Sequence, residues 1–219
     1  MACGLHVAGF VLLLAGVSYS QTKAAPAEVT FTLDFPGSTP QHYSLRVQSD
    51  GKSQYQSSSR ISSESEDVDT FSYDFTISPA TRDRIFELSA RAGHFESDLD
   101  SHKKNMAFTG RKTLSYKDGS RSGESTYNYT LNPSAQELTS LLQGVSATLE
   151  LGHRLEFSLR YQKLALAEEL KRTEESARMT APVEMQAIAP ILQQIVADAS
   201  VINVTRARAQ RLIDRYPAQ

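Results

Sequence analysis

Five residues that can ligate a metal ion occupy every second position of one short segment. They are His94, Glu96, Asp98, Asp100 and His102. On an extended segment alternate side chains point the same way, and imidazole and carboxylate groups are ligands for divalent cations. The segment is therefore a candidate metal site, and a metal-assisted hydrolase built around residues 94–102 is one interpretation. Residues four positions apart on a strand lie about 13 Å from each other, so the alternative is a polar loop between a helix and a strand.

Other catalytic motifs are absent from the sequence. It contains no Gly-x-Ser-x-Gly elbow and no Gly-rich loop that would hold a phosphate group. The acidic residues between positions 64 and 69 lack the glycine and the ligand spacing of an EF-hand loop. His42 and His153 each stand alone and are expected at a strand edge or on a helix surface. We therefore predict no catalytic residue, no cofactor and a protein that is not an enzyme.

The N-terminal residues have the pattern of a secretory signal peptide. Residues 7–17 are apolar and uncharged, and Ser18 and Ser20 supply the small side chains that a signal peptidase requires. The apolar run is too short to span a membrane, which takes about 20 helical residues. We predict that residues 1–20 are removed after Ser20, with the stretch around Ala24 as an alternative cleavage point. A buried or membrane-retained N-terminal helix is the alternative to cleavage.

The cysteine content and the net charge bear on the compartment and the partners. Cys3 is the only cysteine and would be lost with the signal peptide, so the mature chain would fold without disulfides. The net charge of -2 provides no strong field that would attract nucleic acid or anionic lipid. We expect a periplasmic or secreted protein with no nucleic-acid partner and no stable membrane span after cleavage.

Residues 28–131, which follow a short leader at residues 21–27, are predicted to form an antiparallel sheet domain. Apolar and polar side chains alternate there with the period of two that a half-buried strand requires. Asp50-Gly51 and Lys117–Ser120 supply tight turns, and the serine- and acid-rich residues 57–69 are expected to form an exposed loop. The apolar members of the alternating runs are Val29, Phe31, Leu33, Phe35, Tyr43, Leu45, Val47, Phe71, Tyr73, Phe75, Ile77, Tyr127, Tyr129 and Leu131.

One helix is predicted inside this domain, over residues 79–92. Ser78 is a typical N-cap residue, and Pro79 suits the first helical position because its missing N–H would have no partner there. Gly93 favours termination of the helix. The order of strands, one helix and more strands predicts the α+β class, with a twisted antiparallel sheet and a helix packed on it.

Residues 133–216 are predicted to form a helical region of two to four helices. Asn132 and Pro133 repeat the cap-then-proline signal, Gly152 favours a bend, and Pro182 marks a break. The long apolar stripes of these helices must be covered by the sheet, by each other or by a second copy of the chain. Self-association through the C-terminal helices is therefore expected.

Two parts of the chain carry a resemblance to known sequences. The first part consists of Pro40, Tyr43, Leu45, Val47, Asp50-Gly51, Tyr55, Ile77-Ser78-Pro79 and a helix that ends near Phe95. It is similar to small exported bacterial domains of unknown function. The second part, Arg160-Tyr161-x-Lys163-Leu164-Ala165-Leu166 and Arg206-Ala207-Arg208-Ala209, resembles hypothetical secreted proteins of soil bacteria. The resemblance implies export and the layout described above, and it implies no activity and no functional residue.

Taken together, the patterns favour an exported, non-enzymatic protein of the cell envelope that binds or scaffolds a partner. The partner is an unidentified protein or a second copy of the chain. A metal-assisted hydrolase that uses the segment at residues 94–102 is the alternative, and an inhibitor or a chaperone-like envelope factor is a further alternative.

Overall fold

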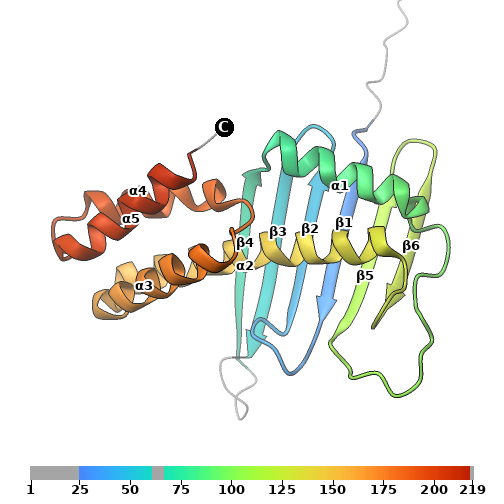
Figure 1. Cartoon of the computed structure of the whole chain (residues 1–219), viewed down its shortest axis with the longest axis horizontal. Helices are drawn as coiled ribbons and strands as arrows, with labels where there is room; N and C mark the ends of the chain where they lie inside the picture. The colour runs from blue at the N-terminus through green and yellow to red at the C-terminus, as the bar shows by residue number, and fades with distance from the viewer. Residues whose placement is uncertain (1–24, 61–66, 218–219) are drawn as a thin grey trace, which may run out of the picture.

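The computed structural model describes residues 25–60 and 67–217 (Figure 1). The predicted signal peptide, the start of the predicted leader and part of the predicted acidic loop lie outside these residues. Within the described ranges the chain forms an antiparallel sheet and five α-helices, which confirms the predicted α+β class.

The sheet contains six strands in the order β4-β3-β2-β1-β5-β6, and neighbouring strands are antiparallel. The first four strands form a meander, and the chain then crosses through a helix to β5 on the other side of β1. The prediction of an exposed loop over residues 57–69 was wrong at both ends, because residues 57–60 belong to β3 and residues 68–69 belong to β4. The strands are β1 (Glu28–Asp34), β2 (His42–Gln48), β3 (Lys52–Arg60), β4 (Val68–Thr76), β5 (Arg111–Lys117) and β6 (Ser122–Tyr127).

Two helices, α1 (Pro79–Arg91) and α2 (Pro133–Tyr161), lie across one face of the sheet (Figure 1). Both begin where the cap-then-proline signals predicted. The hydroxyl of Ser78 accepts a hydrogen bond from the Thr81 amide at 3.3 Å, and the side-chain oxygen of Asn132 accepts one from the Ala135 amide at 3.1 Å. These bonds satisfy amides that would otherwise be unpaired in the first turn of each helix.

The core lies between this face and the two helices. In β1, Val29, Phe31 and Leu33 point toward the helices and are buried, as their alternation predicted. The opposite face of the sheet carries polar side chains, such as Thr30 and Thr32 from the same strand. Residues of both the sheet and the C-terminal helices belong to one hydrophobic cluster.

The remaining helices form a helical arm, which we define as the last turns of α2 together with residues 163–216. Figure 1 shows that α2 continues past β4 and that the arm extends beyond this edge of the sheet. Ion pairs join its helices, including Arg154–Glu169 at 2.8 Å and Lys163–Asp198 at 2.8 Å. Besides the last turns of α2, the arm contains α3 (Lys163–Met179), the 3-10 helix η2 (Met185–Ile188), α4 (Ala189–Ala197) and α5 (Asn203–Arg215).

Two glycines in α2 allow the chain to pack closely against this helix. A Cβ at Gly152 would lie 2.6 Å from a methyl carbon of Ile188, and a Cβ at Gly144 would lie 2.9 Å from one of Val183. The predicted break at Pro182 is confirmed, because α3 ends at Met179. The helix α2 runs without interruption through Gly152, so this glycine provides close approach where a bend was expected.

Glu184 connects the arm to the first helix of the sheet domain. Its carboxylate accepts hydrogen bonds from the Ser78 amide at 3.0 Å and from the Ser78 hydroxyl at 2.5 Å. Glu184 is buried and has a positive φ of 57°, a conformation that is uncommon for a residue with a side chain.

Within residues 25–60 and 67–217, none of the helices combines the length and the apolar character that a membrane span requires.

Candidate functional site

The segment of alternating histidines and acids is not extended, so the prediction that its five side chains share one direction was wrong. Residues 93–95 form a short 3-10 helix, and His94 adopts a left-handed backbone conformation with φ of 52°. The His94 ring packs against Tyr116 at 4.4 Å between centroids and approaches Arg121 at 3.4 Å. The turn at Gly93–Phe95 therefore directs His94 toward β5 and the β5–β6 turn.

Asp98, Asp100 and His102 lie together in a tight turn, where their polar atoms bond to one another. One Asp98 oxygen accepts the Asp100 amide at 2.9 Å, and the other lies 2.7 Å from His102 Nε2. Asp100 accepts the Asn128 amide at 3.0 Å, which ties the turn to the end of β6. The amide of Asp100 and the nearby His102 lower the pKa of Asp98, and Asp98 raises the pKa of His102. Among the described residues no group of three or more His, Cys, Asp or Glu side chains is arranged to hold a metal ion.

A larger candidate site is a cleft of about 670 Å³ at the junction between the sheet and the arm. Its walls come from β3 and β4 on one side and from α2 and α3 on the other, where the two helices pass beyond the edge of the sheet (Figure 1). This volume is within the range of small-molecule sites. The lining residues are Thr39, Ser57, Ser59, Arg60, Asp69, Phe71, Glu150, His153, Arg154, Phe157, Ser158, Gln162, Ala165 and Glu169.

Glu150 on α2 is held in this cleft by two hydroxyl groups from β3. Its Oε1 atom accepts hydrogen bonds from the Tyr55 hydroxyl at 2.8 Å and from the Ser57 hydroxyl at 2.6 Å. Tyr55 is completely buried, and burial together with the Glu150 carboxylate raises the pKa of Tyr55 far above its ordinary value. The second carboxylate oxygen, Oε2, has no partner within the described part of the chain. Glu150 also has no ion-pair partner there, although it is half-buried.

His153 lies one helical turn after Glu150 and stacks on the ring of Phe71. The two rings are 4.1 Å apart between centroids and inclined by 3°. Neither ring nitrogen of His153 has a hydrogen-bond partner among the described residues. The stacked pair separates the cleft from a smaller cavity of about 110 Å³ beside Ile188 and Pro190. His153 was expected at a strand edge or on a helix surface, and it lies partly buried on α2 against Phe71 of the edge strand β4.

The cationic groups of the cleft differ in their pairing. Arg154 forms an ion pair with Glu169, with 2.8 Å between Nε and Oε1. Arg60, at the end of β3, has no ion-pair partner within residues 25–60 and 67–217. The apolar part of the cleft is provided by Phe71 and by Phe157, whose side chain is half exposed. Within the part of the chain that the structure describes, the cleft thus combines a cation and a carboxylate that form no ion pair with an aromatic surface.

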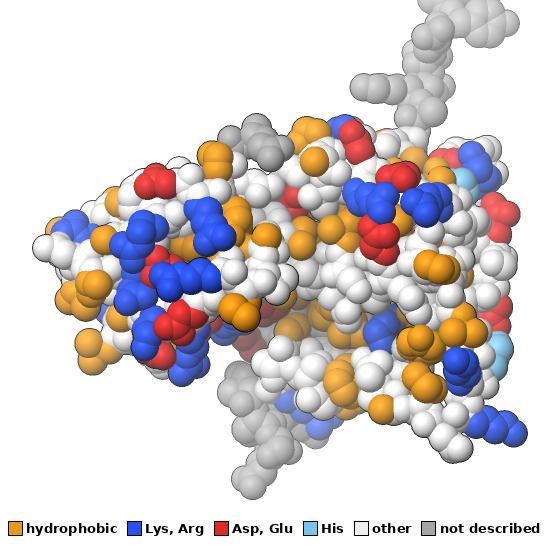
Figure 2. Space-filling model, viewed as in Figure 1, with side chains coloured by type: hydrophobic (Ala, Val, Ile, Leu, Met, Phe, Trp, Pro, Cys, Tyr) orange, Lys and Arg blue, Asp and Glu red, His pale blue; other side chains and the backbone are white. Residues whose placement is uncertain are grey.

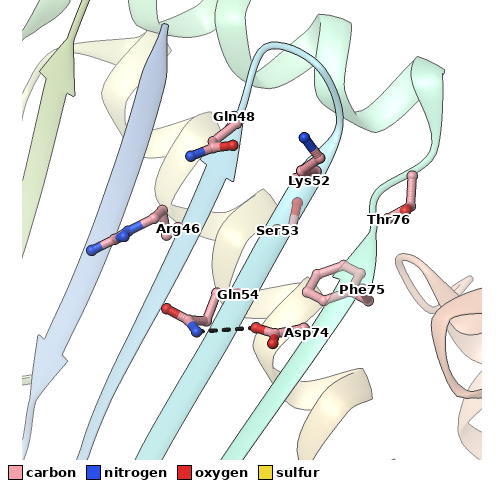
Figure 3. A pocket seen from close by; sticks show the side chains of 8 residues that line it. All are labelled: Arg46, Gln48, Lys52, Ser53, Gln54, Asp74, Phe75 and Thr76. Carbon is pink, nitrogen blue, oxygen red and sulfur yellow. Dashed lines mark hydrogen bonds between the residues drawn. The ribbon is translucent and has the colours of Figure 1, made fainter. Parts of the chain in front are cut away.

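A shallow depression on the opposite face of the sheet, with a volume of about 490 Å³, is a weaker candidate (Figure 3). Its cations are already paired, Lys52 with Asp50 at 2.9 Å and Arg46 with Glu28 at 3.5 Å. Figure 3 shows Gln54 and Asp74 pointing toward each other, and they form a hydrogen bond of 3.0 Å. Both cations are therefore compensated, and Asp74 is a charged lining residue that forms no ion pair with a described cation.

Lys112 is a buried cation that the sequence analysis did not identify. Its ammonium group donates to the carbonyl oxygens of Thr109, Gly110 and Asn128 at 3.0 to 3.1 Å, and no carboxylate of the described residues forms an ion pair with it. Desolvation lowers its pKa. Because these acceptors are backbone groups that flank β5 and β6, Lys112 has a structural role in joining the ends of the two strands.

The end of the arm that lies farthest from the sheet exposes apolar side chains. Figure 2 shows hydrophobic side chains gathered at this end, beside lysines and arginines. The Lys163–Asp198 ion pair brings together the two turns that carry them. The exposed apolar residues on these turns are Tyr161, Leu164, Ile202 and Val204.

The residues of the cleft were missed because its walls come from distant parts of the sequence. The bond between Tyr55 and Glu150 joins positions 95 residues apart. The one local signal was the spacing of Glu150 and His153, which are three positions apart and therefore share a helix face.

No protein-family model matches the chain, and no curated protein is significantly similar to it.

Proposed function

We propose that this chain is an exported, non-enzymatic binding protein and that the cleft between the sheet and the arm holds its ligand. One observation carries the proposal: Glu150 lines the cleft, two hydroxyl groups hold its Oε1 atom, and its Oε2 atom has no hydrogen-bond partner among the described residues. A half-buried carboxylate without a cation is costly unless a ligand or water compensates it.

The chemistry of the cleft favours a ligand with an ammonium or guanidinium group and an apolar part. The cation would pair with Glu150 Oε2, and such a charged hydrogen bond is stronger than a neutral one. The apolar part would pack against Phe71 and Phe157, which line the same cleft. Because Tyr55 and Ser57 fix the carboxylate before the ligand arrives, little side-chain entropy is lost on binding.

A binding role is supported over a hydrolytic role by the partners of the polar groups. The Ser57 hydroxyl donates to Glu150, whereas a serine nucleophile would donate to an imidazole base. The His153 ring is stacked on Phe71. The segment at residues 94–102 does not offer the set of ligands that the hydrolase interpretation requires.

The proposal can be tested with phenethylammonium as a probe, since it combines a cation with an aromatic ring. We expect millimolar binding by isothermal titration calorimetry, and no binding of the neutral analogue 2-phenylethanol. Glu150→Gln should weaken binding by about tenfold or more, because it removes the charge while keeping the shape and a hydrogen-bond acceptor. Glu124→Gln on the exposed face of β6 is the matched control and should leave binding unchanged. Equal affinity of the Glu150 variant, or no binding of the probe, would contradict this assignment of the cleft.

Export and self-association remain parts of the same proposal. The exposed apolar residues at the end of the arm support association with a second copy. A strictly monomeric mass in light scattering at high concentration would contradict association, and an intact Met1 on the native protein would contradict export.

A further inference from the structure

Strand β4 ends the sheet, and the direction of its peptide groups follows from the pairing with β3. The Ile77 amide donates to the Gly51 carbonyl at 3.0 Å, so these opposite residues form a hydrogen-bonded pair. In an antiparallel ladder such pairs alternate with pairs whose N–H and C=O groups point away from the partner strand. The peptide groups of Thr70, Ser72 and Asp74 therefore point outward from the sheet.

These outward groups have no hydrogen-bond partner within residues 25–60 and 67–217. The Ser78 amide lies an even number of residues after Asp74, so it points outward as well. The Glu184 carboxylate accepts a hydrogen bond from this amide at 3.0 Å. The arm therefore satisfies the outward amide just past the end of the strand, and the outward peptide groups of Thr70, Ser72 and Asp74 have no partner among the described residues.

The side chains of β4 are also only partly covered. Phe71, Tyr73 and Phe75 face the helix side and are half-buried, and their rings follow one another at 6.2 and 6.1 Å between centroids. On the opposite face Asp74 accepts the Gln54 amide but forms no ion pair with a described cation. Exposed edge strands of natural proteins are usually short or protected by lysine or proline. β4 is nine residues long and contains neither lysine nor proline, and its charged side chains are Asp69 and Asp74.

We propose that β4 binds an extended segment of a partner protein, which adds to the sheet as a further strand. Backbone hydrogen bonds to Thr70, Ser72 and Asp74 would supply affinity, and the alternating side chains would supply specificity. The partner strand has apolar residues on the side of Phe71, Tyr73 and Phe75. On the other side it has lysine or arginine, because a cation opposite Asp74 completes a cross-strand ion pair.

The helical arm explains why the occupant is a single strand rather than the β4 strand of a second copy. Figure 1 shows the arm extending beyond β4 on the helix side of the sheet. Edge-to-edge pairing of two copies would bring the helix layer of the second copy into this same space. A lone strand has no helix layer and meets no such obstacle.

Hydrogen exchange measured by NMR on the full mature chain tests the proposal directly. The probe is a pool of acetylated and amidated heptapeptides with lysine at odd positions and Val, Leu, Phe or Tyr at even positions. At a tenfold excess over the dissociation constant, the amides of Thr70, Ser72 and Asp74 should exchange about tenfold more slowly. Ser122, Glu124 and Thr126 on β6 are the internal control and should gain no protection. A pool with glutamate in place of lysine should protect β4 less.

A pair of variants at one position completes the test. Ser72→Pro removes an outward N–H without removing a bond to β3, so it should weaken binding by about tenfold or more, whereas Ser72→Ala should bind like the wild type. Unchanged slow exchange of Phe71 and Tyr73 will show that the proline variant is folded.

The proposal is overturned if the lysine pool gives no protection, if β6 is protected equally, or if the glutamate pool binds as well. Protection of β4 that rises with protein concentration alone would identify a second copy as the occupant and would also overturn it. Addition of a partner strand at β4 is a separate binding event from ligand binding in the cleft. Neither Ser72 variant alters Glu150, so failure of one proposal leaves the other intact.

Discussion

Strands β4 and β6 both end the sheet, but the chain covers the helix-facing side chains of β6 and leaves those of β4 half exposed. In β6, Gly123, Ser125 and Tyr127 are buried. The segment at residues 93–102 packs against β6 and is joined to it by a hydrogen bond of 2.8 Å from the Leu99 amide to the Ser125 hydroxyl. An isolated bridge between Asp100 and Thr130 continues this contact. The two edge strands therefore differ in how far the chain covers their helix-facing side chains.

The largest effect is expected from Gly123→Ala, which would push the covering segment away from β6. A Cβ at Gly123 would lie 2.2 Å from the His94 carbonyl oxygen and 2.9 Å from the Glu96 amide nitrogen. Because both contacts are with backbone, we expect a loss of about 3 kcal/mol in the free energy of unfolding, measured by urea denaturation. Gly119→Ala has open space around its Cβ and should have little effect. A Gly123 variant as stable as the wild type would show that the segment does not need this close contact.

A smaller loss is expected from Ser125→Ala, which removes the acceptor of the buried Leu99 amide. An unsatisfied buried donor costs about 1–3 kcal/mol, so the free energy of unfolding should fall by about 2 kcal/mol. The control is Ser122→Ala at an exposed position of the same strand. Equal stability of the two variants would mean that water replaces Ser125 easily, and β6 would then resemble β4 more closely.

The smallest effect concerns pH and the buried Tyr127 at the end of β6. Burial raises the pKa of Tyr127 from 10.0 to about 12. Above pH 10 the unfolded chain therefore loses a proton that the folded chain retains, and stability falls as the pH rises toward 12. Tyr127→Phe should remove about 1 kcal/mol of the loss in unfolding free energy between pH 10 and pH 11. Tyr161→Phe, at a ring that is 65% exposed, is the control. An unchanged slope in the Tyr127 variant would show that this hydroxyl is solvated in the folded state.

Local signals predicted the elements of the fold well. Ser78-Pro79 and Asn132-Pro133 marked the starts of α1 and α2, because a cap and a proline act within a single helical turn. Alternation along β1, β2 and β4 predicted which side chains face the helices, because one face of the sheet is polar. These signals depend on neighbours in the sequence, and the fold class followed from their order.

The candidate site could not be predicted in the same way. Glu150 is a candidate binding residue because Tyr55 and Ser57 hold its carboxylate, and these hydrogen bonds join a helix and a strand that are far apart in the chain. The predicted metal segment failed for a local reason, since His94 and Phe95 both adopt positive φ values and break the extended pattern. Lys112 follows the alternation of its strand but is a residue type rarely buried, so the pattern alone gave no reason to place it in the interior.

The carboxylate of Glu184 has a consequence for the cooperativity of the whole molecule. It lies at the N-terminus of α1, where the partial positive charge of the helix dipole favours an anion. A chain shortened before residue 184 would lose this anion as well as the helices that follow, and α1 would begin with a weaker cap. The part of the chain from residue 184 onward is therefore not a detachable module: its removal would loosen α1, because the bonded partners Ser78 and Glu184 are 106 residues apart in the sequence.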